Sequence, residues 1–323
     1  PILWSIYGAY EYGIAKFLNF ILITIPIAII ILEKFKYDDV KNIFLILLGV
    51  VFLLLLFALT GFFETPRPDG RISILGGGPI IFGRWMGFGV IALFFLPIKK
   101  KYIFRLIFIL IFLVYCLISG SRGPFIALLL SFIFYFFLNF RKIFLRLSVL
   151  LLLLSAIFFS TNLYKDISEL GRTDRVFLNI AKRGGSSEST QTRYELAERS
   201  YDLMLKYPFG VGAGNWQFKA NQYNPTHLMA HEYPHNLFFE IINEYGILVG
   251  ILLFLFILHI TYISFSKMNN YSNKKSLYPL LFYLWIFLLL NAMLSGSLND
   301  SRLLFITACC VLIINPLIIK EDE

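Results

Sequence analysis

The chain is poor in charged residues, in cysteine and in histidine. Of its 323 residues only 15% are Asp, Glu, Lys or Arg, whereas soluble domains carry about a quarter. A chain this apolar would expose large patches to water, which excludes an ordinary soluble enzyme. The three cysteines lie inside apolar runs, so neither a disulfide framework nor a thiolate metal site is expected. The 29 Lys and Arg lie mostly between apolar runs, so no nucleic acid is expected as a partner.

What the chain has in abundance is apolar sequence, which makes up 58% of its residues. About 20 helical residues cross a hydrocarbon core about 30 Å thick, so these runs predict an all-α, polytopic membrane helical bundle. The nine predicted spans are 14–32, 43–63, 79–96, 102–119, 124–140, 143–160, 236–260, 277–294 and 303–319. The chain starts at Pro1 without the features of a signal peptide, so we expect a truncation there and further helices upstream.

Basic residues alternate between successive connections. Lysines cluster in the connections near 34–41, 99–101 and 267–275, which the positive-inside rule assigns to the cytoplasm. The intervening connections then face outward. Among them, 161–235 is far longer than usual, which predicts one large external helical loop domain. The expected domains are therefore 1–160 with six spans, 161–235 outside, and 236–323 with three spans.

The external stretch contains the pattern of an amphipathic helix. Ser189 or Thr190 is the expected N-cap, and Pro208 is expected to end the helix. Apolar positions recur at helical spacing in Tyr194, Ala197, Tyr201, Met204 and Leu205. We expect this helix to lie near the membrane surface.

Arginines occur at the outward ends of several predicted helices. Arg84 lies within 79–96, and Arg122 and Arg302 lie where their helices begin. Helix N-termini present free N–H groups to an anion, and Arg binds phosphate bidentately. The alternative for each Arg is snorkelling to the interface or pairing with an acid such as Asp300. Arg84, well inside its span, is the hardest to explain in that way.

Three histidines, His227, His231 and His235, recur every four residues and raise the possibility of zinc. Pro225 and Pro234 interrupt this segment, so the imidazoles would not share a helical face and no metal is predicted. His235 precedes a predicted helix N-terminus, which disfavours the protonated imidazole and keeps it available as a base. The alternative is a structural histidine that caps the span.

Polar residues continue into the span that follows His235. Asn236, Glu240, Asn243 and Glu244 lie on one face of the predicted helix. This stripe either lines a polar cavity or forms hydrogen bonds that hold neighbouring helices together. The glycine-rich segment 210–214 follows no predicted strand, so we interpret it as a turn and not as a phosphate loop.

Several segments share the spacing of a known family's motifs. They are Arg193 and Arg199 on the external helix, the sequence YPFGVGAG at 207–214, HNLFFE at 235–240, and EYG at 244–246. In these motifs the chain resembles the O-antigen ligase and Wzy-type polymerase superfamily, and the hairpin 119–123 is similar to its upstream Ser-Arg motif. The likeness covers about 75–317 and is most specific at 193–250. Val249 departs from the family pattern, which has a glycine there, and Gly250 follows one residue later.

The resemblance implies a GT-C-like glycosyltransferase in the bacterial cytoplasmic (inner) membrane, with its site facing the periplasm. Such an enzyme takes a glycan from an undecaprenyl diphosphate carrier and passes it to a sugar hydroxyl, inverting the anomeric centre without metal or cofactor. The implied partners are the carrier-linked donor, a glycan or lipid A-core acceptor, and membrane lipid.

By position in the motifs, His235, Arg193 and Arg122 match the family's functional residues. We expect His235 to act as base toward the acceptor, or to orient it, while the two arginines bind the leaving diphosphate. The expected substrate-binding residues are Arg84, Arg302, Asn236 and Arg199. The sequence leaves open whether the acceptor makes the protein a polymerase or a ligase. A solute transporter is a further alternative, because a polar stripe within a span also suits a permeation path.

Overall fold

The structure, a computed structural model, describes residues 7–65, 71–97, 102–139, 188–221, 233–270 and 276–314. These residues are almost entirely helical, and the strand-like pairing within them is one isolated bridge between Glu64 and Ile74. The predicted all-α class is therefore confirmed. The chain divides into two compact units, one made of 1–43 and 186–323 and the other of 44–185.

Helices of membrane-spanning length run through both units. Within the described ranges they are Gly13–Lys34, Tyr37–Thr60, Gly78–Phe95, Arg122–Asn139, Ile247–Asn270 and Tyr278–Ser295, with a shorter apolar helix at Tyr102–Ile118. The protein is thus a multi-pass membrane protein. The predicted span 143–160 lies outside the described residues. The predicted sidedness and three-domain division stay predictions.

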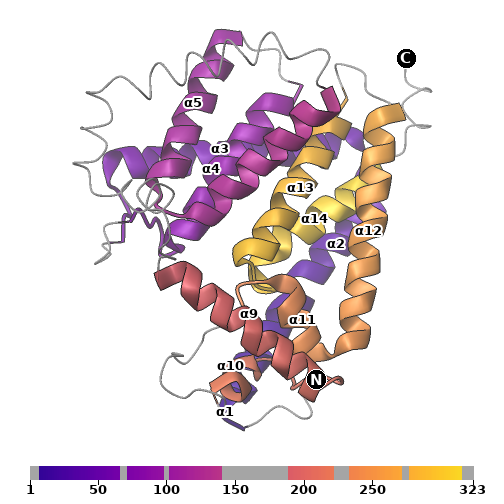
Figure 1. The fold of residues 1–323 in the computed structure, drawn as a ribbon. Coiled ribbons are helices and arrows are strands. Elements are labelled where there is room, and N and C mark those ends of the chain that lie inside the picture. Colours follow the sequence, from indigo (N-terminus) through magenta and orange to yellow (C-terminus); the bar gives the residue numbers. More distant parts are fainter. Residues whose placement is uncertain are drawn as a thin grey trace. The chain divides into compact units, whose positions relative to one another are not determined.

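The unit 44–185 is built around α4 (Gly78–Phe95) and α5 (Tyr102–Ile118), which run side by side (Figure 1). Pro79 begins α4, where its missing N–H is not needed. The two helices approach closely because Gly89 has no side chain: a Cβ there would lie 2.8 Å from both Phe112 and Val51. Most of α3 (Tyr37–Thr60) also belongs to this unit.

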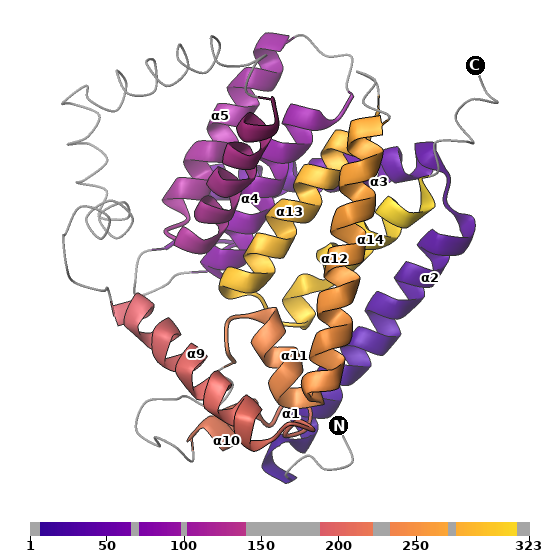
Figure 2. The same ribbon diagram turned by 45° about the vertical axis from the view of Figure 1, so that its right-hand side comes forward.

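The first span, in the other unit, is not a regular helix. It consists of α1 (Tyr7–Asn19), the π-helical turn η2 (Phe20–Thr24) and α2 (Ile25–Lys34). Pro26 follows the π turn, and proline disrupts the hydrogen bonding of the preceding helical turn. This span packs against α14 (Arg302–Ile313), with Phe20 and Phe305 in edge-to-face contact. N-terminal and C-terminal helices therefore share one core (Figure 2).

Two long helices complete this bundle. The helices α12 (Ile247–Asn270) and α13 (Tyr278–Ser295) pack together, and Trp285 Nε1 donates a hydrogen bond of 2.8 Å to Thr261 Oγ1 between them. A 3-10 turn, η3 (Asn299–Ser301), joins α13 to α14. At the same end of the bundle lie three further elements, α9 (Glu188–Lys206), α10 (Trp216–Asn221) and α11 (Leu237–Tyr245) (Figure 1).

The predicted external helix exists as α9, but its packed face differs from the pattern that we identified. Leu196 and Leu203 are buried against Trp216, whereas Tyr194 and Tyr201 are exposed. A buried hydrogen bond of 3.1 Å from Trp216 Nε1 to Ser200 Oγ completes the packing. The polar Ser200 therefore lies on the buried face because it has a partner there.

The single span predicted at 236–260 is wrong. The chain forms two helices there, α11 and α12, which are separated at Gly246, where φ is +95°. A Cβ at Gly246 would lie 2.8 Å from the carbonyl carbon of Phe209, so the break fits only glycine. The polar residues Asn243 and Glu244 directly precede the break, but the sequence analysis placed them in a stripe on one continuous helix. Pro234 lies two residues before the cap of α11.

Candidate active site

The N-terminal end of α11 holds the best-defined candidate, His235. Asn236 is the N-cap: its Oδ1 accepts a hydrogen bond of 3.1 Å from Phe239 N, and its Nδ2 donates one of 2.9 Å to Met293 O. His235 directly precedes this cap and has φ +54°, which few non-glycine residues adopt. Its ring lies 4.3 Å from that of Tyr233 between centroids. Strained backbone of this kind concentrates at functional sites.

The C-terminal end of α11 is held by the glycine-rich segment 210–214. Val211 N donates to Asn243 O over 2.7 Å, and Gly212 N donates to Glu244 O over 3.1 Å. These bonds satisfy carbonyls that the end of a helix leaves open. The segment is thus a turn, as the sequence indicated, and its role is to fix α11. At the start of α12, Gly250 allows close contact with Ile242, because a Cβ there would lie 2.2 Å from its side chain.

The carboxylates of α11 meet a lysine from the first span. Lys16 Nζ pairs with Glu240 and, at 2.5 Å, with Glu244 Oε2. All three side chains are buried, with exposed fractions of 2%, 0% and 2% for Lys16, Glu240 and Glu244. These contacts support the interpretation that the polar stripe forms hydrogen bonds between helices. Asn243 is the exception, because it bonds within its own helix to Phe239 O. The sequence analysis did not single out Lys16, although a lysine within a span is a signal in itself.

Two carboxylates share one ammonium group in this cluster, which therefore has one negative charge in excess. The helix α11 is not among the spanning helices. Burial raises the pKa of Glu240 to about 7; the Lys16 ammonium opposes this rise and the charge of Glu244 adds to it. A proton retained by the carboxylate pair near neutral pH balances the excess charge.

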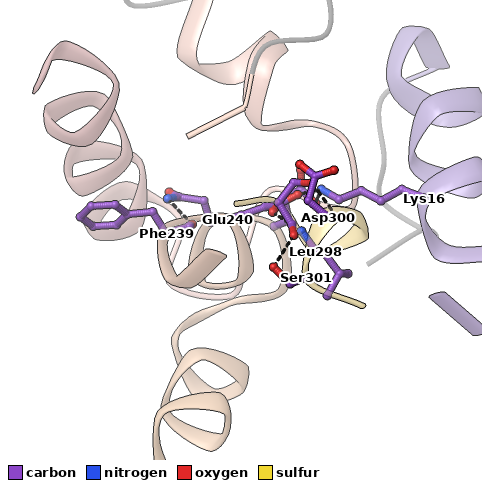
Figure 3. A network of polar contacts seen from close by, with 9 residues as sticks. Lys16, Phe239, Glu240, Leu298, Asp300 and Ser301 are labelled. Atoms are coloured by element: carbon purple, nitrogen blue, oxygen red, sulfur yellow. Dashed lines mark hydrogen bonds and ion pairs between the residues drawn. The ribbon is translucent and has the colours of Figure 1, made fainter. Parts of the chain in front are cut away.

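Glu240 also connects α11 to the beginning of α14. Its Oε2 accepts a hydrogen bond of 2.7 Å from Leu298 N, one residue before η3 (Figure 3). Within the turn, Ser301 Oγ donates to Ser297 O over 2.7 Å. Arg302 follows directly as the first residue of α14, half-buried. Its Nε is buried without a hydrogen-bond partner among the described residues. His235 and Arg302 are thus carried by segments that Glu240 ties together.

The helix α9 brings two more arginines to this end of the unit. It packs against α11, and both Arg193 and Arg199 are half-buried on it. Arg199 Nη2 lies 3.9 Å from Glu195 Oε2, a weak helical ion pair. For Arg199 the structure thus provides the acid partner that the alternative interpretation requires.

The unit 44–185 holds Arg84 and Arg122. Gly83, next to Arg84, packs against the hairpin that precedes Arg122, since a Cβ at Gly83 would lie 2.9 Å from Ser119 Oγ. The side chain of Arg71 lies against Gly120 of the same hairpin, whose φ is +69°. The hairpin thus contacts Arg71 and leads directly into Arg122, and Arg84 follows the glycine that packs against it. We did not predict Arg71, and its signal in the sequence would have been the glycine that its side chain covers.

These features define an all-α, multi-pass membrane protein with arginines and one strained histidine at helix ends. Residues 106–255 match the family model described as O-antigen ligase. The match covers somewhat less than half of the chain and includes the hairpin at 119–123 and all of α9, α10 and α11. It supports the resemblance to the O-antigen ligase and Wzy-type superfamily that the motifs indicated. A search of the curated proteins finds no match for the chain.

Proposed function

We propose that the protein is a membrane glycosyltransferase that moves a glycan from an undecaprenyl diphosphate carrier to a sugar hydroxyl. The family match supports a glycan-transferring membrane protein in general. The donor, the acceptor and the location at the outer face of the bacterial cytoplasmic membrane are parts of the proposal. They follow from the family motifs and from the basic connections of the sequence.

One observation carries the proposal furthest. His235, in a strained conformation, precedes α11, and Arg302, whose buried Nε has no partner among the described residues, follows η3. Glu240 joins these two segments. A buried donor without a partner costs about 1–3 kcal/mol, and an anionic ligand would remove that cost. The N-terminus of α14 adds its dipole to the attraction. A diphosphate fits this arrangement in charge and in hydrogen-bonding capacity.

The proposed reaction is a single displacement. The acceptor oxygen attacks the anomeric carbon, its proton passes to the His235 imidazole, and the bond between that carbon and the diphosphate oxygen breaks. The diphosphate leaves with the bonding electrons, and Arg193 and Arg122 stabilise the charge that it gains. Because the leaving group is already a good anion, the step requires no general acid, and attack from the opposite face inverts the configuration.

Four further residues are proposed to bind substrate: Arg84, Arg302, Asn236 and Arg199. For Asn236 the contacts point to an additional role, because both of its side-chain polar atoms already bond within the protein. It fixes the backbone next to His235. Arg199 has a nearby acid, so its contribution is expected to be the smallest of the four.

The acceptor distinguishes polymerase from ligase, and we propose a polymerase as the first possibility. The test is incubation of purified protein in nanodiscs with carrier-linked repeat units, with and without lipid A-core. Growth of carrier-linked chains without lipid A-core supports a polymerase, and glycan transfer only to lipid A-core supports a ligase. Uptake of labelled solute by proteoliposomes, with no transfer to either acceptor, would contradict both and favour a transporter.

A further inference from the structure

The Lys16 cluster is an unusual structure for the interior of a helical bundle. Its three charged side chains are buried and come from two segments 228 residues apart in sequence. Burying ions costs several kcal/mol each, and a buried ion pair often stabilises a fold less than apolar residues of similar size. Stability alone therefore gives a weak reason for these residues, whereas fixing one geometry gives a stronger one.

The contacts of Glu240 show what the cluster holds in place. One carboxylate oxygen pairs with Lys16, and the other accepts the N–H of Leu298 (Figure 3). Glu240 lies one helical turn after the cap Asn236, and Leu298 leads through η3 into Arg302. Glu244 also pairs with Lys16, but the bond to the turn comes from Glu240. The two glutamates thus share the charge partner and differ in this one connection.

We propose that the Lys16–Glu240 pair is a positioning element of the active site, an inference that rests on the function proposed above. Lys16 does not touch substrate. It fixes the rotamer of Glu240, and Glu240 fixes the distance from the N-terminus of α11, with His235, to the start of α14, with Arg302. Losing the bond to Leu298 frees the turn, and a displacement of about 1 Å at a reacting centre can lower turnover about 100-fold.

The difference between the two glutamates supplies a matched test. Glu240→Met and Glu244→Met each remove one buried carboxyl group and leave Lys16 one carboxylate, so the net charge of the cluster is the same in both variants. Only Glu240→Met leaves Leu298 N without its acceptor. We expect kcat to fall about 10- to 100-fold in Glu240→Met with the donor KM little changed. In Glu244→Met we expect kcat to stay within about threefold of the wild type.

Variants of Lys16 extend the test. Lys16→Met leaves two carboxylates facing each other, so it should lower kcat and also the thermal midpoint. Lys16→Arg keeps a cation that can reach both carboxylates, so it should recover much of the turnover. Equal loss in both glutamate variants, or no loss in Glu240→Met, would overturn the proposal, provided that thermal unfolding shows both variants folded.

A distance measurement separates this inference from the proposed function. Nitroxide labels at Asp300→Cys, beside the turn, and Tyr201→Cys, on the exposed face of α9, report the position of the turn after the three native cysteines are replaced by alanine. We expect a narrow distribution in the wild type and in Glu244→Met, and a broader or shifted one in Glu240→Met. This result can stand even if no glycan transfer is found, which would refute only the proposed function. An unchanged distribution in Glu240→Met refutes the positioning role.

Discussion

The two ends of α14 differ in whether the polar groups beside them have hydrogen-bond partners among the described residues. At its C-terminal end, Lys267 from α12 donates 2.7 Å bonds to Val311 O and Ile314 O, satisfying carbonyls that the helix leaves open. At its N-terminal end, the Nε of Arg302 is buried without a partner among the described residues. A cation whose donors are satisfied stabilises the fold, whereas a buried donor without a partner can bind a ligand. On this comparison we propose a structural role for Lys267 and a functional role for Arg302.

The largest effect should follow from removing the arginines assigned to the leaving diphosphate. Arg193→Ala and Arg122→Ala should each lower turnover about 10²–10³-fold, as when one oxyanion donor is lost, because the charge that they contact grows in the transition state. Substitution by Lys in place of Ala should restore only part of the lost turnover, since Lys lacks the bidentate fork of Arg. Turnover and carrier affinity in nanodiscs provide the measurement. Lys206→Ala, at the exposed C-terminal end of α9, is the control and should remain active.

Replacing the cation at each end of α14 by methionine tests the comparison directly. Lys267→Met should lower the free energy of unfolding by about 1–3 kcal/mol and leave the turnover of folded protein unchanged. Arg302→Met should lower turnover or carrier affinity about tenfold with little loss of stability, because it removes a donor that has no partner in the described part of the chain. Thermal unfolding and steady-state kinetics on both variants decide the question. The reverse pattern would show that the two ends have been assigned wrongly.

Stability should depend on pH through Glu240. Its folded pKa lies near 7, above the 4.5 of an ordinary glutamate, so the folded state holds a proton that the unfolded state releases. This contribution is complete below pH 4.5 and is lost as the pH rises through 7. The free energy of unfolding should therefore fall by roughly 2–3 kcal/mol between pH 5 and pH 8. The fall should be smaller in Glu240→Met, and an equal fall in both proteins would assign it to other groups.

The backbone at His235 offers a smaller but clean effect. Glycine adopts φ near +54° without strain, so His235→Gly should be about 1 kcal/mol more stable than His235→Ala. Both variants should lack turnover if the imidazole is the base. Denaturation curves of the two variants measure the strain separately from the chemistry. An active His235→Gly would return the residue to a structural role.

No effect is expected from a chelator. The proposed displacement uses arginines where other glycosyltransferases would use a metal, so EDTA should leave turnover unchanged. His227 and His231 lie outside the described residues, and a zinc site there stays an alternative. Loss of turnover in EDTA with recovery on added zinc or magnesium would revive it and remove His235 from the role of base.

Much of the fold could be predicted because the relevant signal is local. Apolar runs of about 20 residues give the span positions, and Pro79 and Pro279 mark the starts of α4 and α13. The break at Gly246 could not be predicted from hydropathy, because it depends on contact with Phe209, 37 positions earlier. Glycines at both 210 and 246 were the available clue: a Cβ at Gly210 would lie 2.6 Å from Gly246 N.

The same distinction between local and distant signals applies to the candidate site. The positions of His235 and Arg302 could be predicted, because each stands beside a helix start that the sequence marks. Lys16 was not, because its meaning depends on carboxylates more than 200 residues away. Arg71 has its partner glycine 49 positions later, which is again beyond any local pattern. Residues that act through distant partners require the three-dimensional structure.

The separation of Lys16 from its partners also matters while the protein is being made. A ribosome adds about 5–20 residues per second, so Lys16 precedes Glu244 by 228 positions and roughly 10–45 s. Throughout that interval the ammonium lies in an apolar span with no carboxylate to receive it, at a cost in the bilayer. Synthesis of α11 removes this cost. An unfinished chain therefore lacks the two carboxylates that balance the charge of Lys16 in the span Gly13–Lys34.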